Sequence, residues 1–305
     1  MGIYTGKVTP SEIAVSAGEH TIGIGLKDSK YYLKKSIAVK NNTSGQLITL
    51  INDLQTAKEW KALFIGINSA QVPSGSCTSE YSTAELDKGF EFLKWSFEER
   101  LEVYSYNTVD WSFDRFDITQ TVTLNDDAVL TPSIIDGYLA DHNIAKGDYD
   151  FVVSFYRGGD VLNDAGLPTG QGCKLGSFQG LGWYEYDDLE VEASYAQIRY
   201  WDNIIDAIDY SKEYEKDPGM FIHEWLHSVA EINGKTFFKG QGYSMPSSKG
   251  DVVHAAGAYG YEYPWMTWYQ DIISGKVEDN GKYLGITPEA FLACSVREKV
   301  LGDCD

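Results

Sequence analysis

The sequence contains few cysteines, few basic residues and no long apolar segment. Its 305 residues include four cysteines, none in a CxxC pair, so a cysteine zinc site is not expected. No apolar run approaches the roughly 20 residues that a membrane-spanning helix requires, and we therefore expect no membrane insertion. Lys and Arg total 25 against 45 Asp and Glu, a net charge of −20. Because such a chain repels phosphate groups, the charge excludes general nucleic-acid binding.

The remaining composition is that of a folded globular protein, with 43% apolar and 23% charged residues. The length allows one large or two modest domains. Charge is unevenly distributed, because residues 1–50 contain six lysines and three acidic residues, net +3, which leaves −23 for the rest of the chain. This change predicts a boundary near residues 50–58, with a small domain at 1–52 and a larger one at 53–305.

Alternating segments indicate that the small domain is all-β. Apolar residues recur at every second position, and polar turns separate the segments, which predicts a small antiparallel sandwich. The segments are 12–16, 20–26, 36–40 and 46–50.

The same region resembles a PEGA-type domain. The resemblance is carried by residues 9–10 (TP), 17–22 (AGEHTI), 31–32 (YY) and the strand that ends at Val39. It implies an accessory module for attachment or spacing.

The larger domain alternates strands and helices. Ser82 and Glu85 form a capping box, and apolar residues then recur on one face of a long helix. Residues 158–182 contain eight glycines and are predicted to form a long loop. Strands are predicted at 60–67, which is buried by its composition, at 150–156 and at 194–201. Together these elements predict an α/β (α+β) fold with helices on a mixed sheet.

The clearest chemical signal is an HExxH motif, formed by His223, Glu224 and His227 within a predicted helix over 219–233. Residues four apart lie on one helix face, so both imidazoles can direct a ring nitrogen at one zinc ion. Glu224 lies beside the ion and is expected to act as general base and acid on zinc-activated water. Apolar residues surround the motif, and buried His and Glu side chains are costly without a partner. The motif therefore predicts Zn²⁺ as the cofactor.

A zinc site needs a third protein ligand. We predict His254, which follows His227 by 27 positions. Glu231 lies about 6 Å further along the helix axis than His227, so it is expected to orient a histidine rather than to bind the ion. Asp251 and Glu262 remain alternative ligands.

With this motif the sequence resembles the zincin metallopeptidases. The resemblance implies a zincin-like catalytic domain with an active-site helix, and a sheet-edge strand, here 195–201, that pairs with extended substrate. The metzincin pattern is absent, because Ala230 replaces its Gly and Asn233 its third His. Zincin chemistry also needs an oxyanion donor. The candidates are Tyr243, Tyr259, Tyr261 and Tyr263.

The predicted function is that of a zinc metalloendopeptidase, which hydrolyses the peptide bonds of a protein, peptide or glycoprotein substrate. The alternative is a catalytically modified zincin scaffold that binds glycan or peptide at the cell surface. The acidic, Tyr- and Trp-rich composition favours a monomeric bacterial protein that is secreted or attached to the cell surface, its signal segment lying outside the given sequence. Two cysteine states remain open: four thiols, or disulfides joining Cys294 to Cys304 and Cys77 to Cys173.

Overall fold

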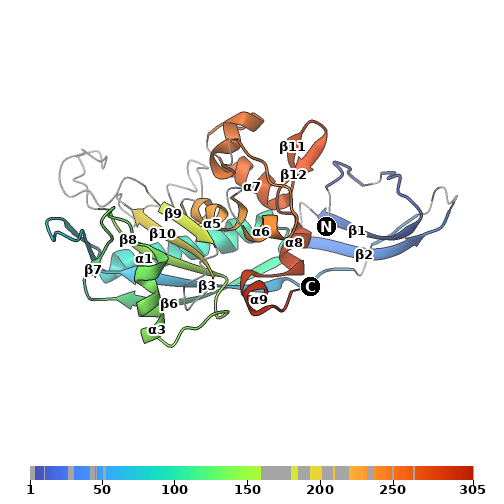
Figure 1. Cartoon of the computed structure of the whole chain (residues 1–305). Helices are drawn as coiled ribbons and strands as arrows, with labels where there is room; N and C mark the ends of the chain where they lie inside the picture. The colour runs from blue at the N-terminus through green and yellow to red at the C-terminus, as the bar shows by residue number, and fades with distance from the viewer. Residues whose placement is uncertain are drawn as a thin grey trace.

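The protein is described by a computed structural model and forms a mixed α/β structure with several sheets (Figure 1). The described residues are 4–9, 11–26, 31–41, 45, 47–50, 53–158, 180–184, 193–200, 209, 220–231, 236–248, 251–263 and 265–304. None of the described helices combines the length and the apolar character that crossing a membrane requires.

The central sheet has five described strands in the order β6-β3-β8-β10-β9. Their bounds are β3 (Lys58–Ile67), β6 (Val109–Ile118), β8 (Phe151–Arg157), β9 (Gly180–Tyr184) and β10 (Ser194–Tyr200). The pairs β3–β6, β3–β8 and β8–β10 are parallel, whereas β9 is antiparallel to β10. The mixed sheet is therefore confirmed.

The position of the edge strand differs from the prediction. The strand expected at 195–201 is β10, which pairs with β8 on one side and with β9 on the other. The outermost described strand is β9, whose residues fall partly within the stretch predicted as a loop. Glycine-rich composition signals a loop, but here Gly180 and Gly182 occupy strand positions because the adjacent helix leaves no room for side chains.

Alternating side chains divide the core into a layer on each face of the sheet. Trp60, Ala62 and Phe64 of β3 pack with apolar residues of α1 (Thr83–Ser96) and α5 (Met220–Ala230). Leu63 and Ile65 face the other way, toward α3 (Pro132–Asp141). This arrangement follows from the period of two along a strand, which places successive side chains on opposite faces.

Helix α1 begins as its sequence predicts. The Ser82 side chain accepts a hydrogen bond from the backbone of Glu85, and the Glu85 carboxylate accepts one from the backbone of Ser82. The helix continues through a π-helical turn, η1 (Phe97–Leu101), into α2 (Glu102–Tyr104).

Shorter elements complete the larger domain. They are β4 (Ser69–Gln71), β5 (Thr78–Glu80), β7 (Val122–Thr123), α6 (Phe237–Gly240), the 3-10 helix η3 (Val253–Tyr259), α7 (Met266–Ser274), β11 (Val277–Asp279), β12 (Lys282–Leu284), α8 (Pro288–Ala293) and α9 (Val296–Leu301).

The N-terminal region contains a two-stranded sheet rather than the predicted four-stranded sandwich. β1 (Gly18–Leu26) pairs antiparallel with β2 (Tyr31–Val39), while the described residues of segments 12–16 and 46–50 lie outside any strand. Leu54 instead forms an isolated bridge with Leu33 of β2. An alternating apolar pattern requires only that one face of the sheet be covered, and a second sheet is not needed for this. Here the larger domain covers part of the apolar face of β1 and β2.

The hairpin contacts the C-terminal part of the chain (Figure 1). The buried Tyr32 hydroxyl donates to Glu289 of α8 at 2.6 Å, and the Lys34 ammonium forms an ion pair with the same carboxylate at 2.6 Å. Gly23 of β1, which pairs with Lys34, leaves space for the Tyr32 ring. These contacts attach the N-terminal strands to the larger domain.

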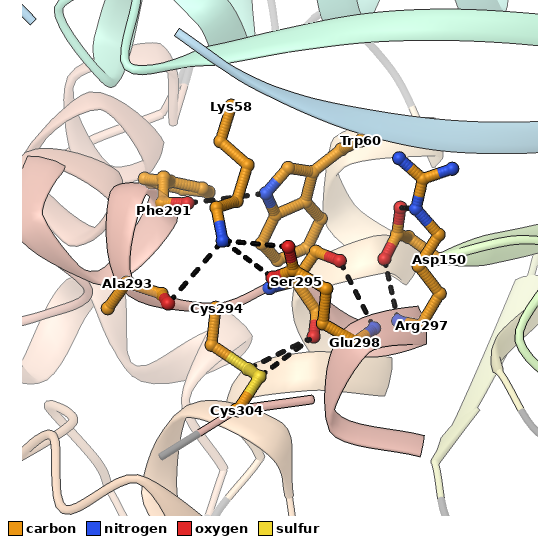
Figure 2. Close-up of a disulfide and its surroundings, with 10 residues drawn as sticks. All are labelled: Lys58, Trp60, Asp150, Phe291, Ala293, Cys294, Ser295, Arg297, Glu298 and Cys304. Carbon is orange, nitrogen blue, oxygen red and sulfur yellow. Dashed lines mark hydrogen bonds and ion pairs between the residues drawn. A yellow bond between two sulfur atoms is a disulfide. The ribbon is translucent and has the colours of Figure 1, made fainter. Parts of the chain in front are cut away.

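Of the two cysteine states left open, the structure shows the disulfide between Cys294 and Cys304, which closes the C-terminal segment around α9 (Figure 2). Next to it, the Arg297 backbone N–H donates to Asp150 at 2.7 Å, and Lys58 pairs with Glu298 at 2.6 Å. Cys77 is also disulfide-bonded.

The expected partner of Cys77, Cys173, lies outside the described residues.

Candidate metal centre

The HExxH motif lies in the middle of α5, as predicted. Phe221, Trp225 and Leu226 are fully buried in the core, so tertiary packing holds the helix in place. His223 and His227 lie on the remaining face, with side chains 16% and 18% exposed. The residues expected to start and end this helix, 217–218 and 234, lie outside the described residues.

Three histidines direct the same ring atom at one point. The Nε2 atom of His223 lies 3.2 Å from Nε2 of His227 and 3.1 Å from Nε2 of His254. His254 comes from η3, which packs beside α5. The three side chains form a group that could hold a metal ion, as the sequence predicted for these three residues.

The second nitrogen of each ring has an oxygen partner. Nδ1 of His223 lies 2.8 Å from the Tyr269 hydroxyl, Nδ1 of His227 lies 2.9 Å from Glu231, and Nδ1 of His254 lies 2.7 Å from Asp251. In a histidine that binds a metal, the hydrogen bond of the ring nitrogen that does not bind the metal sets the tautomer. The carboxylates of Glu231 and Asp251 only accept, so they place the proton of His227 and His254 on Nδ1 and leave the Nε2 lone pairs for an ion. The Tyr269 hydroxyl can accept from Nδ1 of His223 in the same way.

Glu231 also connects the two segments that carry the histidines. Its Oε1 atom accepts a hydrogen bond from the Val252 backbone N–H at 3.2 Å, in addition to its contact with His227. Val252 immediately precedes η3, which carries His254. One carboxylate thus positions a ligand on α5 and the backbone next to the third ligand.

Glu224 is 4% exposed and lies between α5 and β9. Its Oε1 atom is 4.0 Å from Nε2 of His223, so the carboxylate is beside the three nitrogens rather than among them. A methyl group at Gly180 would approach the Glu224 carboxyl group to 2.5 Å. Strand β9 therefore closes one side of the space that this carboxylate occupies.

The pKa values of the two helix histidines shift in opposite directions. Burial, together with the neighbouring rings of His227 and His254, lowers the pKa of His223 well below its ordinary value. Burial opposes the charged form of His227 as well, but its hydrogen bond with Glu231 and nearby carboxylates raise its pKa. His223 therefore enters the group as a neutral base, the form that binds metals.

The alternative third ligands take other positions. Glu231 and Asp251 contact histidine Nδ1 atoms, which is the position expected of a residue that orients a histidine. Both also form, with His227, a second group that could hold a metal ion. Glu262 is exposed and belongs to none of the possible metal-binding groups of the described residues.

The tyrosine that contacts the centre was missed by the sequence reasoning. Tyr269 is fully buried on α7, 46 positions beyond His223, and nothing in its local sequence marks it. Tyr259 and Tyr261 instead bond to Ser247 and Asp271.

Comparison of the chain with protein-family models, with curated proteins and with solved structures finds no match.

Proposed function

We propose that the protein is a zinc-dependent metalloendopeptidase. The observation that carries the proposal is the convergence of three Nε2 atoms from His223, His227 and His254, next to a buried glutamate. Three protein ligands with a fourth position left for water or substrate are typical of catalytic zinc sites, whereas structural sites have four protein ligands.

The spacing of the nitrogens supports zinc. Zinc binds imidazole at roughly 2.0–2.1 Å in tetrahedral geometry, which separates two ligand nitrogens by about 3.3 Å. The two measured separations, 3.2 and 3.1 Å, are close to that value. The all-nitrogen donor set also suits zinc better than calcium or magnesium, which prefer oxygen.

The proposed reaction assigns one role to each side chain. Zinc in such a site acidifies water and polarises a carbonyl group. Glu224 takes the proton from the attacking water and delivers it to the leaving amine. Glu231 and Asp251 hold His227 and His254 in the tautomer that the site needs, and Tyr269 orients the ring of His223. The low exposure of Glu224 keeps bulk water from competing for the proton.

Two substitutions test this proposal. Glu224→Gln should retain zinc and lose hydrolysis of an unfolded protein substrate by at least about 100-fold, the lower end of what general acid–base catalysis contributes. His254→Ala should lose zinc, measured by elemental analysis of the purified chain. His20→Ala is the matched control, because this histidine bonds to the Ser16 backbone on the N-terminal hairpin.

Two results would contradict the proposal. Full zinc content in His254→Ala would remove that residue from the ligand set. Full activity in Glu224→Gln would remove Glu224 from the reaction.

The disulfides support an extracellular location. None of the described cysteines is free, and disulfides persist in oxidising compartments such as the cell exterior. We therefore propose that the enzyme acts outside the cytosol on protein or peptide substrates.

A further inference from the structure

Two aromatic rings lead from the metal centre toward solvent. The Trp265 ring is nearly parallel to His223, with an angle of 13° and a centroid distance of 6.4 Å, and it lies 6.2 Å from His254. Tyr263 lies 6.2 Å beyond Trp265 and is 62% exposed. The His254 side chain is 50% exposed, so this side of the centre faces solvent. We call Tyr263 and Trp265 the aromatic shelf.

The neighbouring aromatic residues hold this segment in place. Tyr259 and Tyr261 both pack on the buried Trp268 ring. The Trp268 indole donates to the Val253 backbone at 3.0 Å, which fixes the start of η3. The shelf is thus supported by a packed layer, and its Trp265 ring lies beside His223 and His254.

The surroundings of the shelf are acidic. Between Lys249 and Lys276 the chain contains three carboxylates and no further Lys or Arg. Asp251 contacts His254, and Asp271 accepts from the Tyr261 hydroxyl. Glu262, which directly precedes Tyr263, is exposed. The larger domain as a whole carries −23, so the field at this surface favours a cation.

We propose that the aromatic shelf binds an arginine side chain of the substrate next to the bond that is cleaved; this inference rests on the proposed peptidase function. A guanidinium is planar, stacks on aromatic faces and always carries a positive charge. Tyr263 and Trp265 offer the faces, and Glu262 offers the opposite charge. A neutral apolar ring would use the faces alone, whereas a guanidinium also carries the charge opposite to that of the carboxylate.

The test compares peptides that differ in one side chain. A peptide series with a single arginine at successive positions around the cleaved bond is paired with the same series carrying citrulline, which has the shape of arginine without its charge. A cation on an exposed aromatic face strengthens binding by a factor of roughly 2 to 5. Attraction between the guanidinium and the Glu262 carboxylate strengthens binding further. We expect kcat/KM to be about fivefold or more higher for arginine at one position near the bond.

Variants locate the preference on the shelf. Tyr263→Ala, Trp265→Phe and Glu262→Gln should each lower the arginine-to-citrulline ratio, with zinc content as the check that the centre is intact. Tyr31→Ala is the matched control, because Tyr31 is an aromatic residue of the N-terminal hairpin that is 49% exposed. It should keep the full ratio.

Binding separates failure of this inference from failure of the proposed function. Zinc-loaded Glu224→Gln protein is titrated with the arginine and citrulline peptides by calorimetry. Equal affinities, or an arginine preference that survives all three shelf variants, would overturn the inference. Tighter binding of the arginine peptide without any hydrolysis by the wild-type protein would overturn the peptidase function and leave the shelf in place.

Discussion

Glu231 provides the sharpest test of how the metal centre is assembled. Its Oε1 atom accepts from His227 at 2.9 Å and from the Val252 backbone at 3.2 Å. Glu231→Ala removes both hydrogen bonds, so His227 loses its fixed tautomer and the backbone before His254 loses its tie to α5.

The size of the effect follows from these two contacts. Loss of an outer partner of a metal-bound histidine lowers metal affinity by roughly 10- to 100-fold, which corresponds to about 1.4–2.7 kcal/mol. Since Glu231 serves two segments, we expect the upper part of this range. Glu231→Gln retains a carbonyl oxygen that accepts both bonds, and its loss of affinity should be several-fold smaller.

The assay is zinc competition with a chromophoric chelator, combined with urea unfolding of the metal-free protein. The control is Glu98→Ala, which removes an exposed carboxylate from η1. Wild-type zinc affinity in Glu231→Ala would refute the reasoning. A loss of stability in the metal-free protein without a loss of affinity would assign Glu231 a purely structural role.

Three further outcomes test the strand packing, the disulfide and a buried carboxyl group. Gly180→Ala places a methyl group 2.5 Å from the Glu224 carboxyl group. Because small displacements of a catalytic group are costly, kcat should fall at least tenfold at unchanged zinc content. An unchanged kcat would show that β9 does not position Glu224. Replacing Cys294 and Cys304 with serine opens a loop of sequence separation 10. The free energy of unfolding, measured by urea denaturation, should fall by about 3 kcal/mol. An unchanged denaturation midpoint would contradict this prediction. Burial raises the pKa of Glu102 to about 7 from 4.5, against the backbone hydrogen bond that it accepts. The folded state therefore holds more protons than the unfolded state between those values, and stability falls as pH rises through this window. Glu102→Gln should remove that pH dependence and stabilise the protein at pH 8 but not at pH 4, and an unchanged stability profile would exclude Glu102 as its source.

Signals within one or two helical turns were sufficient for several features. The capping box of Ser82 and Glu85 and the helix that carries His223 and His227 depend on neighbours three or four residues apart. The third histidine, His254, was reached because the chain has only five histidines. The disulfide between Cys294 and Cys304 was one of two open states, and the structure decided it.

The errors concern contacts between distant segments. The alternating apolar pattern at 12–16 and 46–50 is compatible with strands, but a strand also needs a neighbouring strand to pair with. In the structure, β2 instead forms an isolated bridge with Leu54. Likewise, the sequence at 195–201 indicates a strand and does not say which strands lie beside it. Pairing with β9 places this run inside the sheet.

The amino-acid order alone therefore specified the helix that carries His223 and His227, because side-chain type and helical spacing are local properties, and the small number of histidines pointed to His254. Folding of the whole chain decided what surrounds them. Tyr269 reaches His223 only because α7 packs near α5, and Glu231 reaches Val252 only because η3 does. Such contacts arise from the shape of a shared core, and no periodicity in the chain encodes them.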